Sequence, residues 1–443
     1  MTNLLFVAPS YLPFTGGAQS FLQAMARRLV ADGHTVTVLT TNARQATDFW
    51  AIPHPAEPLA AHETLDGVQV ERLPLVYPSP APYAFGVLRR AGYWLRALRL
   101  PAALQRPLLH RLASWMPPVT GLANALERLV PASDIVQVSD SSWDGLLLAV
   151  AQAAARHNKP LVLVPFMHLG RQIQGHFQML HQIEAYRAAE AVVALSQHEA
   201  QTYMRLGVSP ERVRVLSMGV DPDIPAVGEA EVAAFRREHG LMHPIVAFLG
   251  ANTYDKGAYT TAQAVARLAR EGLPVDLVCA GPQGDSLRNF VRATPSGPLR
   301  DALEQRVHIL DIVDQATKHR LLAAADLLAL PSQVDSFGIV LLEAWLHSKP
   351  VIGANVGGIP DLVQPEQNGL LVPFGDAQTL AAAIRRLVEQ PAWARALGEV
   401  GHQQVMERYT WDHTYRNLLD VYGRARNTRA ATAAPPTTSP EEA

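Results

Sequence analysis

Two carboxylates eight positions apart are the residues best suited to bind a polar ligand. The segment D-S-F-G-I-V-L-L-E-A-W covers residues 335–345, with Asp335 before a predicted helix and Glu343 inside it. Ser336 is predicted to cap this helix, which would begin near Gly338. The first amides of a helix lack intrahelical partners and attract phosphate. Helical rise would separate the acids by ~10 Å, and their neighbours are apolar, so we predict a phosphorylated ligand between them; solvated or salt-bridged carboxylates are the alternative.

Two basic side chains follow predicted strands and could face such a ligand. Lys256 lies between the apolar run 245–249 and Gly257, where a helix is predicted to open. A surface lysine is the alternative interpretation. His168 follows the apolar run 161–164, and α/β sheets bind ligands at the carboxyl ends of their strands. A structural histidine is the alternative there.

Short apolar runs separated by helical patterns predict two parallel sheets, because strands buried on both faces read as continuous apolar segments. Gly16 and Gly17 lie in the loop after the first strand, where they would admit a ligand close to the backbone or form a simple turn. The strands predicted in the first half are 4–8, 35–40, 135–138, 161–164, 191–195 and 213–216. Those in the second half are 245–249, 275–279, 307–310, 327–330, 351–353 and 369–372. The sequence therefore predicts an α/β protein with two Rossmann-like domains.

Polar segments and late helical patterns set the predicted domain limits. A short polar segment separates the two series of strands, so the boundary is expected near residues 222–243. Two helices are expected at about 391–407 and 411–425. The predicted parts are a first Rossmann-like domain at 1–222, a second at 223–408, a final helix at 409–426 and a disordered tail at 427–443 that lacks large apolar residues.

An insertion at about 44–130 interrupts the alternation of strands and helices. Between Arg72 and Leu126 there is no acidic residue, but there are seven arginines with tyrosines and tryptophans among them. One interpretation is a basic amphipathic surface that rests on anionic lipid headgroups. The other is a set of helices whose arginines face water or pair with distant acids. The arginines are Arg72, Arg89, Arg90, Arg96, Arg99, Arg106 and Arg111.

Composition excludes several classes of protein. The net charge of −2 gives no overall attraction to nucleic acid or lipid, so no nucleic-acid partner is expected. The single cysteine, Cys279, rules out an intramolecular disulfide, which fits a reducing compartment. No segment approaches the ~20 apolar residues needed to span a bilayer, and no secretory signal is evident. We therefore expect a cytoplasmic protein, with the insertion offering peripheral contact at the inner face of the membrane.

The segment from Asp335 to Glu343, in which an acid is followed by S-F-G and then by a second acid, resembles the signature of glycosyltransferase family 4. Further matching motifs follow in the same order over most of the chain. They are G-G-A-Q (16–19), A-D-G-H-T-V-T-V-L-T (31–40), A-V-V-A-L-S-Q-H-E (191–199), M-G-V-D (218–221), D-K-G (255–257), A-G-P (280–282), A-D-L-L-A-L-P-S (325–332) and G-G-I-P-D-L-V (357–363). The resemblance implies the GT-B fold, in which two Rossmann-like domains face each other across a cleft and the final helix crosses back to the first domain.

The resemblance also implies a role for each matching residue. Glu343 would bind the ribose hydroxyls of a nucleotide-sugar, and Asp335 the hydroxyls of the transferred sugar. Lys256 would neutralise the departing diphosphate, and His168 would contact the donor sugar. The remaining donor-binding residues would be Ser336, Phe337, Gly338, Ile339 and Val340, whose amides cradle the diphosphate, together with Gly16, Gly17, Gly250 and Ile312.

Two positions depart from the family pattern. The family usually has Glu where this chain has Asp335, which is one methylene shorter. It also often has Arg directly after the glycine at position 250, where this chain has Ala251. The bidentate cation that an arginine would supply is then missing. Arg171 could replace this cation, or the start of the helix near Gly338 could bind more of the diphosphate charge. The third alternative is weaker catalysis.

The resemblance implies transfer with retention at the anomeric carbon, without a metal or other cofactor. The donor would be a UDP- or GDP-sugar, and a lipid-linked acceptor would suit the insertion. No Asp-x-Asp motif suggests a metal clamp, since Asp221-Pro-Asp223 lies in the interdomain segment. The alternatives are another enzyme on the same fold, such as an epimerase or phosphorylase, and a non-catalytic accessory protein that binds nucleotide-sugar or glycan.

Overall fold

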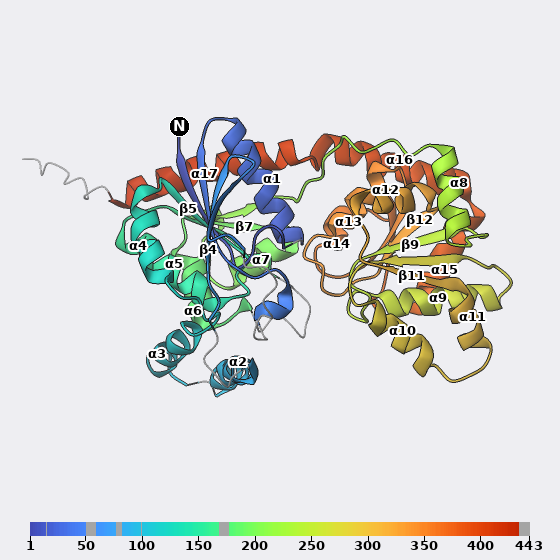
Figure 1. The fold of residues 1–443 in the computed structure, drawn as a ribbon, viewed down its shortest axis with the longest axis horizontal. Helices are drawn as coiled ribbons and strands as arrows, with labels where there is room; N and C mark the ends of the chain where they lie inside the picture. The colour runs from blue at the N-terminus through green and yellow to red at the C-terminus, as the bar shows by residue number, and fades with distance from the viewer. Residues whose placement is uncertain (15, 50–58, 77–81, 99, 168–176, 434–443) are drawn as a thin grey trace, which may run out of the picture. The chain divides into compact units, whose positions relative to one another are not determined.

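The computed structural model describes residues 1–14, 16–49, 59–76, 82–98, 100–167 and 177–433 (Figure 1). The chain divides into two compact units. Of the described residues, unit 1 contains those in the ranges 1–167 and 177–216 and the chain from Tyr415 to Ala433, and unit 2 contains Ser217–Thr414.

Unit 1 is built on an eight-stranded sheet with the order β3-β4-β2-β1-β5-β6-β7-β8. Every neighbouring pair is parallel except β3 and β4. The parallel sheet was predicted, but the β3–β4 hairpin was not, because β3 is a polar edge strand with no buried residue. The strands are β1 Asn3–Val7, β2 Thr35–Thr41, β3 His62–Leu65, β4 Val68–Leu73, β5 Ile135–Ser139, β6 Leu161–Val164, β7 Ala191–Ala194 and β8 Val213–Val215.

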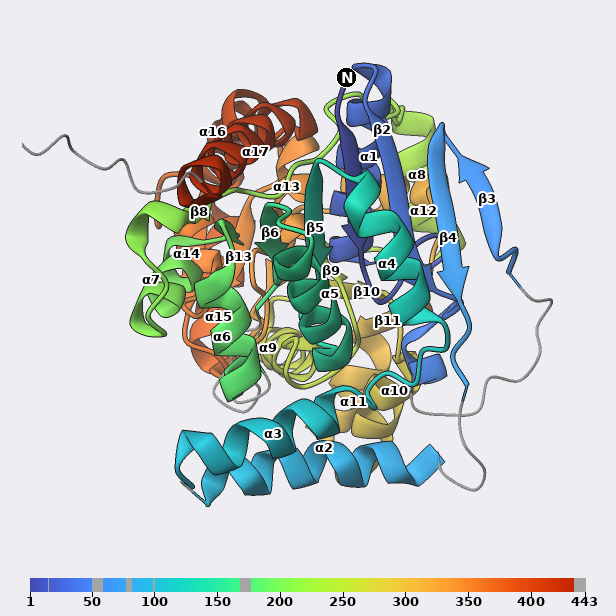
Figure 2. The same cartoon turned by 90° about the vertical axis from the view of Figure 1, so that its left-hand side faces the viewer.

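Helices connect and cover the strands of unit 1, and the arginine-rich insertion supplies three of them, α2, α3 and α4. Figure 2 shows α2 and α3 side by side, below the carboxyl end of β4. The helices are α1 Gly17–Ala31, α2 Pro82–Ala97, α3 Ala102–Ala113, α4 Leu122–Ala132, α5 Asp144–Arg156, α6 Leu180–Ala188 and α7 Gln197–Arg205.

Unit 2 repeats the architecture with a parallel six-stranded sheet of order β11-β10-β9-β12-β13-β14. Its strands are β9 Ile245–Leu249, β10 Asp276–Ala280, β11 Val307–Asp311, β12 Leu327–Leu330, β13 Val351–Ala354 and β14 Gly369–Val372. Its helices are α8 Glu229–Glu238, α9 Ala258–Arg270, α10 Gly284–Ala293, α11 Pro298–Arg306, α12 Gln315–Ala324, α13 Ile339–Leu346, α14 Ile359–Leu362, α15 Ala377–Glu389 and α16 Pro391–Arg408. The predicted pair of Rossmann-like sheets is confirmed.

The last helix, α17 Trp411–Ala433, begins in unit 2 and continues in unit 1. The Tyr422 hydroxyl donates to Gln137 Oε1 on β5 (2.7 Å), and Arg429 pairs with the buried carboxylate of Glu190 (3.0 Å). The predicted start of the tail at residue 427 is therefore wrong, because this ion pair and the alanines beyond it extend the helix to Ala433. Within the described residues, no helix has the length and apolar character needed to cross a bilayer.

Candidate functional site

The loops that follow β9 and β12 meet at the carboxyl-terminal edge of the unit 2 sheet. The two strands are parallel neighbours, and the Gln333 amide donates to the Asp255 carbonyl oxygen (2.9 Å). Gly257 has φ 90°, and a β-carbon there would lie 2.4 Å from the Pro331 carbonyl oxygen. Only glycine satisfies both the conformation and the close approach, so this turn holds Lys256 next to the 331–338 loop.

Lys256 and Asp335 form an ion pair where these loops meet. Lys256 Nζ donates to Asp335 Oδ1 at 3.0 Å, and 24% and 20% of the two side chains is exposed. A partly exposed pair of this kind can exchange partners with an incoming ligand at modest cost. Nothing in the sequence predicted the direct contact between the two side chains.

Helix α13 begins at Ile339, one residue after the predicted start. Gly338 is its N-cap, with φ 88° and ψ 52°, and no side chain caps the helix. The prediction that Ser336 caps it is therefore wrong, because the chain enters the helix through a left-handed turn that favours glycine. Ser336 and Phe337 are buried, whereas Ile339 and Val340 are partly exposed. The backbone amides of the first turn thus lie beside an accessible surface.

Glu343 lies on the second turn of α13, which is otherwise apolar. Its Oε1 accepts a hydrogen bond from Lys318 Nζ on α12 at 2.6 Å. The two side chains are 19% and 18% exposed. Sequence reasoning missed Lys318, since no motif surrounds it and only the fold brings α12 to Glu343.

Glycines bring further backbone to the same edge of the sheet. Gly250 has φ 149°, and a β-carbon on Gly281 would lie 2.1 Å from the Gly250 carbonyl oxygen, so the ends of β9 and β10 are in close contact. A β-carbon on Gly357, after β13, would lie 2.8 Å from the Asp335 carbonyl oxygen. Gly357 therefore supports the loop that carries Asp335.

Ile312, directly after β11, also lies at this edge and is 77% exposed. The preceding residue, Asp311, has φ 57° and accepts hydrogen bonds from Arg288. This bonding to the guanidinium lowers the pKa of the Asp311 carboxyl below its usual value. An exposed isoleucine held by an anchored turn offers an apolar surface to a flat ring.

In unit 1, Gly16 is the N-cap of α1 and Gly17 its first residue, after β1 as predicted. Gly16 has extended backbone, and a β-carbon there would lie 2.6 Å from Gln19 Oε1. His168 and Arg171 lie outside the described residues. The chain before His168 is held by Glu199, whose carboxylate accepts a hydrogen bond from the Met167 amide (3.0 Å).

The predicted residues of unit 2 thus gather at one edge of its sheet. Two acids, two lysines and the first turn of α13 lie among glycine-rich loops, which suits a ligand with phosphate and hydroxyl groups. Among the residues that the structure describes, no group of three or more His, Cys, Asp or Glu side chains could hold a metal ion.

Comparisons with known proteins identify the family. A model described as Glycosyltransferase Family 4 matches residues 15–224, and one described as Glycosyl transferases group 1 matches residues 243–390. The alpha-maltose-1-phosphate synthase of Mycolicibacterium smegmatis is 31% identical over 271 residues, which cover 57% of this chain and 68% of that protein. The chain belongs to glycosyltransferase family 4.

A second family 4 relative is the D-inositol 3-phosphate glycosyltransferase of Salinispora tropica. It is 36% identical over 254 residues, which cover 54% of this chain and 51% of the relative. The chain thus spans between half and about two thirds of the length of these relatives. Membership confirms the prediction of a glycosyltransferase that uses a nucleotide-sugar donor. An epimerase, a phosphorylase or a non-catalytic accessory protein is not favoured.

Solved structures show that the fold of this family 4 member is GT-B. Anabaena HepE in complex with UDP superposes with a TM-score of 0.69 at 20% identity, over 95% of this chain and 99% of that one. The sucrose-phosphate synthase of Thermosynechococcus elongatus superposes with a TM-score of 0.69 at 21% identity, over 97% and 100% of the two chains. The predicted fold class is confirmed.

Proposed function

We propose that the protein transfers a sugar from a UDP-sugar to an acceptor hydroxyl with retention of configuration and without a metal. The observation that carries this proposal is the pair of lysine–carboxylate contacts on either side of the start of α13. The solved complexes of HepE with UDP and with UDP-glucose support uridine as the nucleoside of the donor.

In this proposal each charged group at the edge of unit 2 binds one part of the donor. The diphosphate lies against the first amides of α13, where the helix dipole favours negative charge. Glu343, held by Lys318, accepts hydrogen bonds from the ribose hydroxyls. Asp335 accepts hydrogen bonds from the transferred sugar. Lys256 exchanges its contact with Asp335 for the diphosphate.

The transfer step needs no protein nucleophile. The bond between the anomeric carbon and the diphosphate oxygen breaks, and the acceptor oxygen forms a bond to the same face of that carbon. The acceptor proton passes to the departing diphosphate oxygen. Lys256 and the α13 amides stabilise the negative charge that develops there, and such preorganised groups contribute most in the transition state. With Ala251 in place of arginine, these groups carry more of that charge.

The proposal is tested by donor binding and by one matched pair of variants. Calorimetric titration with UDP-, GDP- and ADP-sugars should give measurable binding for the UDP compounds. Lys256→Ala should lower kcat/KM for transfer roughly 100-fold or more, whereas Arg270→Ala, at an exposed position on α9, should not. Wild-type rates in Lys256→Ala, or inverted product configuration, would contradict the proposal.

We also propose that the helix pair α2–α3 rests on an anionic membrane surface. Val87 and Trp94 on α2 and Leu98 directly after it recur at helical spacing and are exposed, with Trp94 at 72%. The spacing of Leu104, Leu108 and Trp115 places a second exposed apolar row on α3 and just beyond it. The exposed Arg90 and Arg111 add positive charge next to these rows. Apolar side chains with arginines complement an interface of anionic lipid.

Vesicle sedimentation tests this contact. The protein should pellet with vesicles of phosphatidylcholine and phosphatidylglycerol, less so with phosphatidylcholine alone, and less at high salt because salt screens the arginines. Trp94→Glu should reduce pelleting, whereas Val400→Glu, at an exposed position of unit 2, should not. Equal pelleting of both variants would contradict the proposed surface.

A further inference from the structure

The turn that ends β11 is held by an arginine from helix α10. The two terminal nitrogens of the Arg288 guanidinium donate to the two carboxylate oxygens of Asp311, with Nη1 3.0 Å from Oδ1. Arg288 also pairs with Asp285 on its own helix (3.2 Å). A two-point contact between a guanidinium and a carboxylate sets the orientation of both groups, which most surface ion pairs do not. The side chain of Asp311 is therefore fixed in direction.

The backbone around Asp311 is shaped to keep this contact. Asp311 has φ 57°, a left-handed conformation that residues with a β-carbon disfavour, so the turn depends on support from its neighbours. The Gly281 amide, directly after β10, donates to the Asp311 carbonyl oxygen (2.7 Å). A β-carbon on Gly284, the first residue of α10, would overlap Asp311 Oδ1, so glycine leaves room for the carboxylate. The side chain and the main chain of Asp311 are thus both anchored to the segment that links β10 to α10.

This anchored turn presents Ile312, which is 77% exposed, at the carboxyl-terminal edge of the unit 2 sheet. Helix α12 begins at Gln315, and Lys318 in its first turn donates to Glu343 (2.6 Å). Helical rise places Lys318 only ~5 Å from the start of the helix. In a nucleotide the base is bonded directly to the ribose, so a ribose at Glu343 brings its base towards the 312–314 loop. Ile312 is then the apolar surface that the base meets.

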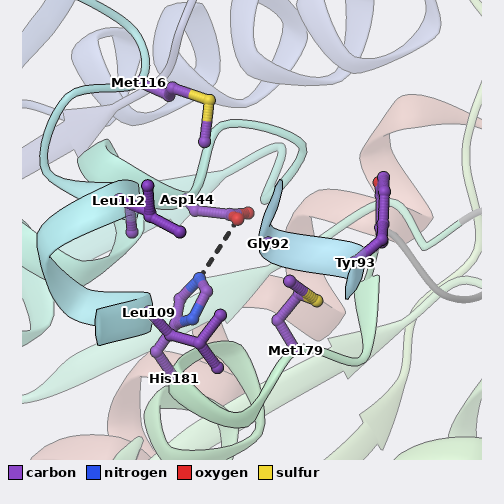
Figure 3. A pocket seen from close by; sticks show the side chains of 9 residues that line it. Gly92, Tyr93, Leu109, Leu112, Met116, Asp144, Met179 and His181 are labelled. Carbon is purple, nitrogen blue, oxygen red and sulfur yellow. Dashed lines mark ion pairs between the residues drawn. The ribbon is translucent and has the colours of Figure 1, made fainter. Parts of the chain in front are cut away.

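A recess in unit 1 is too small for such a ring. It lies between α3 and the first turns of α5 and α6, where the buried His181 faces Asp144, with Nε2 3.1 Å from Oδ2 (Figure 3). The space has room for about one water molecule, so neither a base nor a ribose fits there. The open turn at Ile312 in unit 2, and not this recess, therefore suits a base.

We propose that Arg288 is a positioning residue for the nucleobase of the donor. By fixing the turn at Asp311, it holds Ile312 in place as an apolar support for one face of the base. This inference rests on the proposed function, because the ribose at Glu343 belongs to that proposal. Without Arg288 the turn would relax in the free protein, and binding would have to order it again. The loss should therefore fall on the affinity for the part of the donor that carries the base.

Two ligands that share the ribose and the diphosphate provide the readout. UDP contains the base, whereas ribose 5-diphosphate lacks it. Calorimetric titration of the full chain should show UDP binding about tenfold more tightly than ribose 5-diphosphate. Arg288→Gln should weaken UDP binding about fivefold and leave ribose 5-diphosphate binding unchanged, because the turn does not contact the shared groups. Equal weakening of both ligands would indicate a general loosening of unit 2 and would overturn the proposal.

Three further variants separate the two-point contact from charge and from folding. Gly284→Ala forces the Asp311 carboxylate away without changing any charge, so it should weaken UDP binding as Arg288→Gln does. Arg288→Lys keeps the charge but not the planar fork, and its affinity should be intermediate. Arg292→Gln, at an exposed position on the same helix, should bind UDP as the wild type does. Melting curves confirm that each variant is folded, and wild-type UDP affinity in both Gly284→Ala and Arg288→Gln would contradict the proposal.

A double-mutant cycle shows whether Arg288 acts through Ile312. Ile312→Ala removes the apolar support and should by itself weaken UDP binding about fivefold. Adding Arg288→Gln to this variant should cost less than about twofold more, because no side chain is left to position. Losses that simply add would show that Arg288 acts elsewhere, and the assignment would then be wrong.

Failure of this inference and failure of the proposed function give different results. The titrations need neither an acceptor nor turnover, so an absence of transfer does not affect them. A wild type that binds neither UDP nor ribose 5-diphosphate would remove the proposed donor site and this inference with it. A wild type that binds UDP, with no loss in the variants, would overturn only the role of Arg288.

Discussion

In unit 2, the carboxylates of Asp335 and Glu343 each face a lysine and remain partly exposed, whereas in unit 1 the carboxylate of Glu199 is completely buried. Glu199 accepts hydrogen bonds from the amides of Met167 and Leu195 and from the Tyr203 hydroxyl. Both arrangements lie beyond the carboxyl ends of parallel strands. The same architecture therefore holds its acids in two different ways.

The difference shows which acids are available to a ligand. A partly exposed carboxylate paired with a lysine can exchange that partner for a sugar hydroxyl without a large desolvation cost. Glu199 has no such freedom, because its bonds hold the ends of β6 and β7 together. Burial raises the pKa of Glu199 to about 7. Glu199 thus supports the loop before His168 and is not a ligand-binding group.

Among the variants that test this comparison of acids, Glu343→Ala is expected to have the largest effect on transfer. The variant removes the proposed ribose acceptor and leaves Lys318 without its carboxylate, so kcat/KM should fall roughly 100- to 1,000-fold. Steady-state transfer kinetics measure the loss. Glu304→Ala, at an exposed site on α11, is the control. A fall of less than about threefold in Glu343→Ala would show that this acid does not differ functionally from a structural one.

Replacing Glu199 should change how stability depends on pH. Its folded pKa of about 7 lies above the unfolded value, so the folded state binds more protons between pH 4.5 and 7. Stability should therefore fall as the pH rises through this range, by about 3 kcal/mol from this group. Melting curves against pH should show the fall in the wild type and a flatter profile in Glu199→Gln. Parallel profiles would contradict the assignment.

The strands could be predicted because of how they are buried. Segments such as Leu161–Val164 and Leu327–Leu330 are covered on both faces and form continuous apolar runs, so their limits agree with the prediction. The edge strand His62–Leu65 carries no such run and was missed. A continuous apolar run is thus what makes a strand visible in sequence, and β4 was missed because Gln69, Glu71 and Arg72 interrupt its apolar residues although most of the strand is buried.

The site was predicted only where its residues share a motif. Asp335 and Glu343 lie on one short segment, but Lys318 reaches Glu343 from a different helix, and neither local spacing nor composition marks it. The N-cap was assigned to Ser336 because serine is a favoured N-cap residue. The structure instead has Gly338 at this position, in a left-handed conformation that the sequence alone does not show.

A smaller effect is expected from Lys318→Ala. Glu343 would keep its charge and its place on α13 but lose the lysine that orients it, so the KM for the donor should rise about tenfold, equivalent to about 1.4 kcal/mol. Lys318→Arg should restore part of the affinity. An unchanged KM in Lys318→Ala would show that the contact with Glu343 is incidental.

The smallest predicted effect is a difference in stability between alanine variants at two glycines with left-handed backbone conformation, Gly33 in unit 1 and Gly338 in unit 2. Gly338→Ala should destabilise the protein by about 1–2 kcal/mol, because φ is 88° and the new β-carbon would approach a Leu341 methyl group to 3.2 Å. Gly33→Ala has a similar φ of 79° but meets no atom within 4 Å, so it should cost only about 1 kcal/mol. Melting temperatures measure both, and equal losses would show that packing around Gly338 adds nothing.

Helix α17 has a consequence for how the molecule is made. Tyr422 and Arg429 bond to β5 and to Glu190 of unit 1, yet they are synthesised only after all of unit 2. During translation, unit 1 therefore cannot form these bonds until unit 2 has been synthesised. A fragment ending at Leu216 lacks these bonds, so unit 1 is complete only when the two distant stretches of chain are joined.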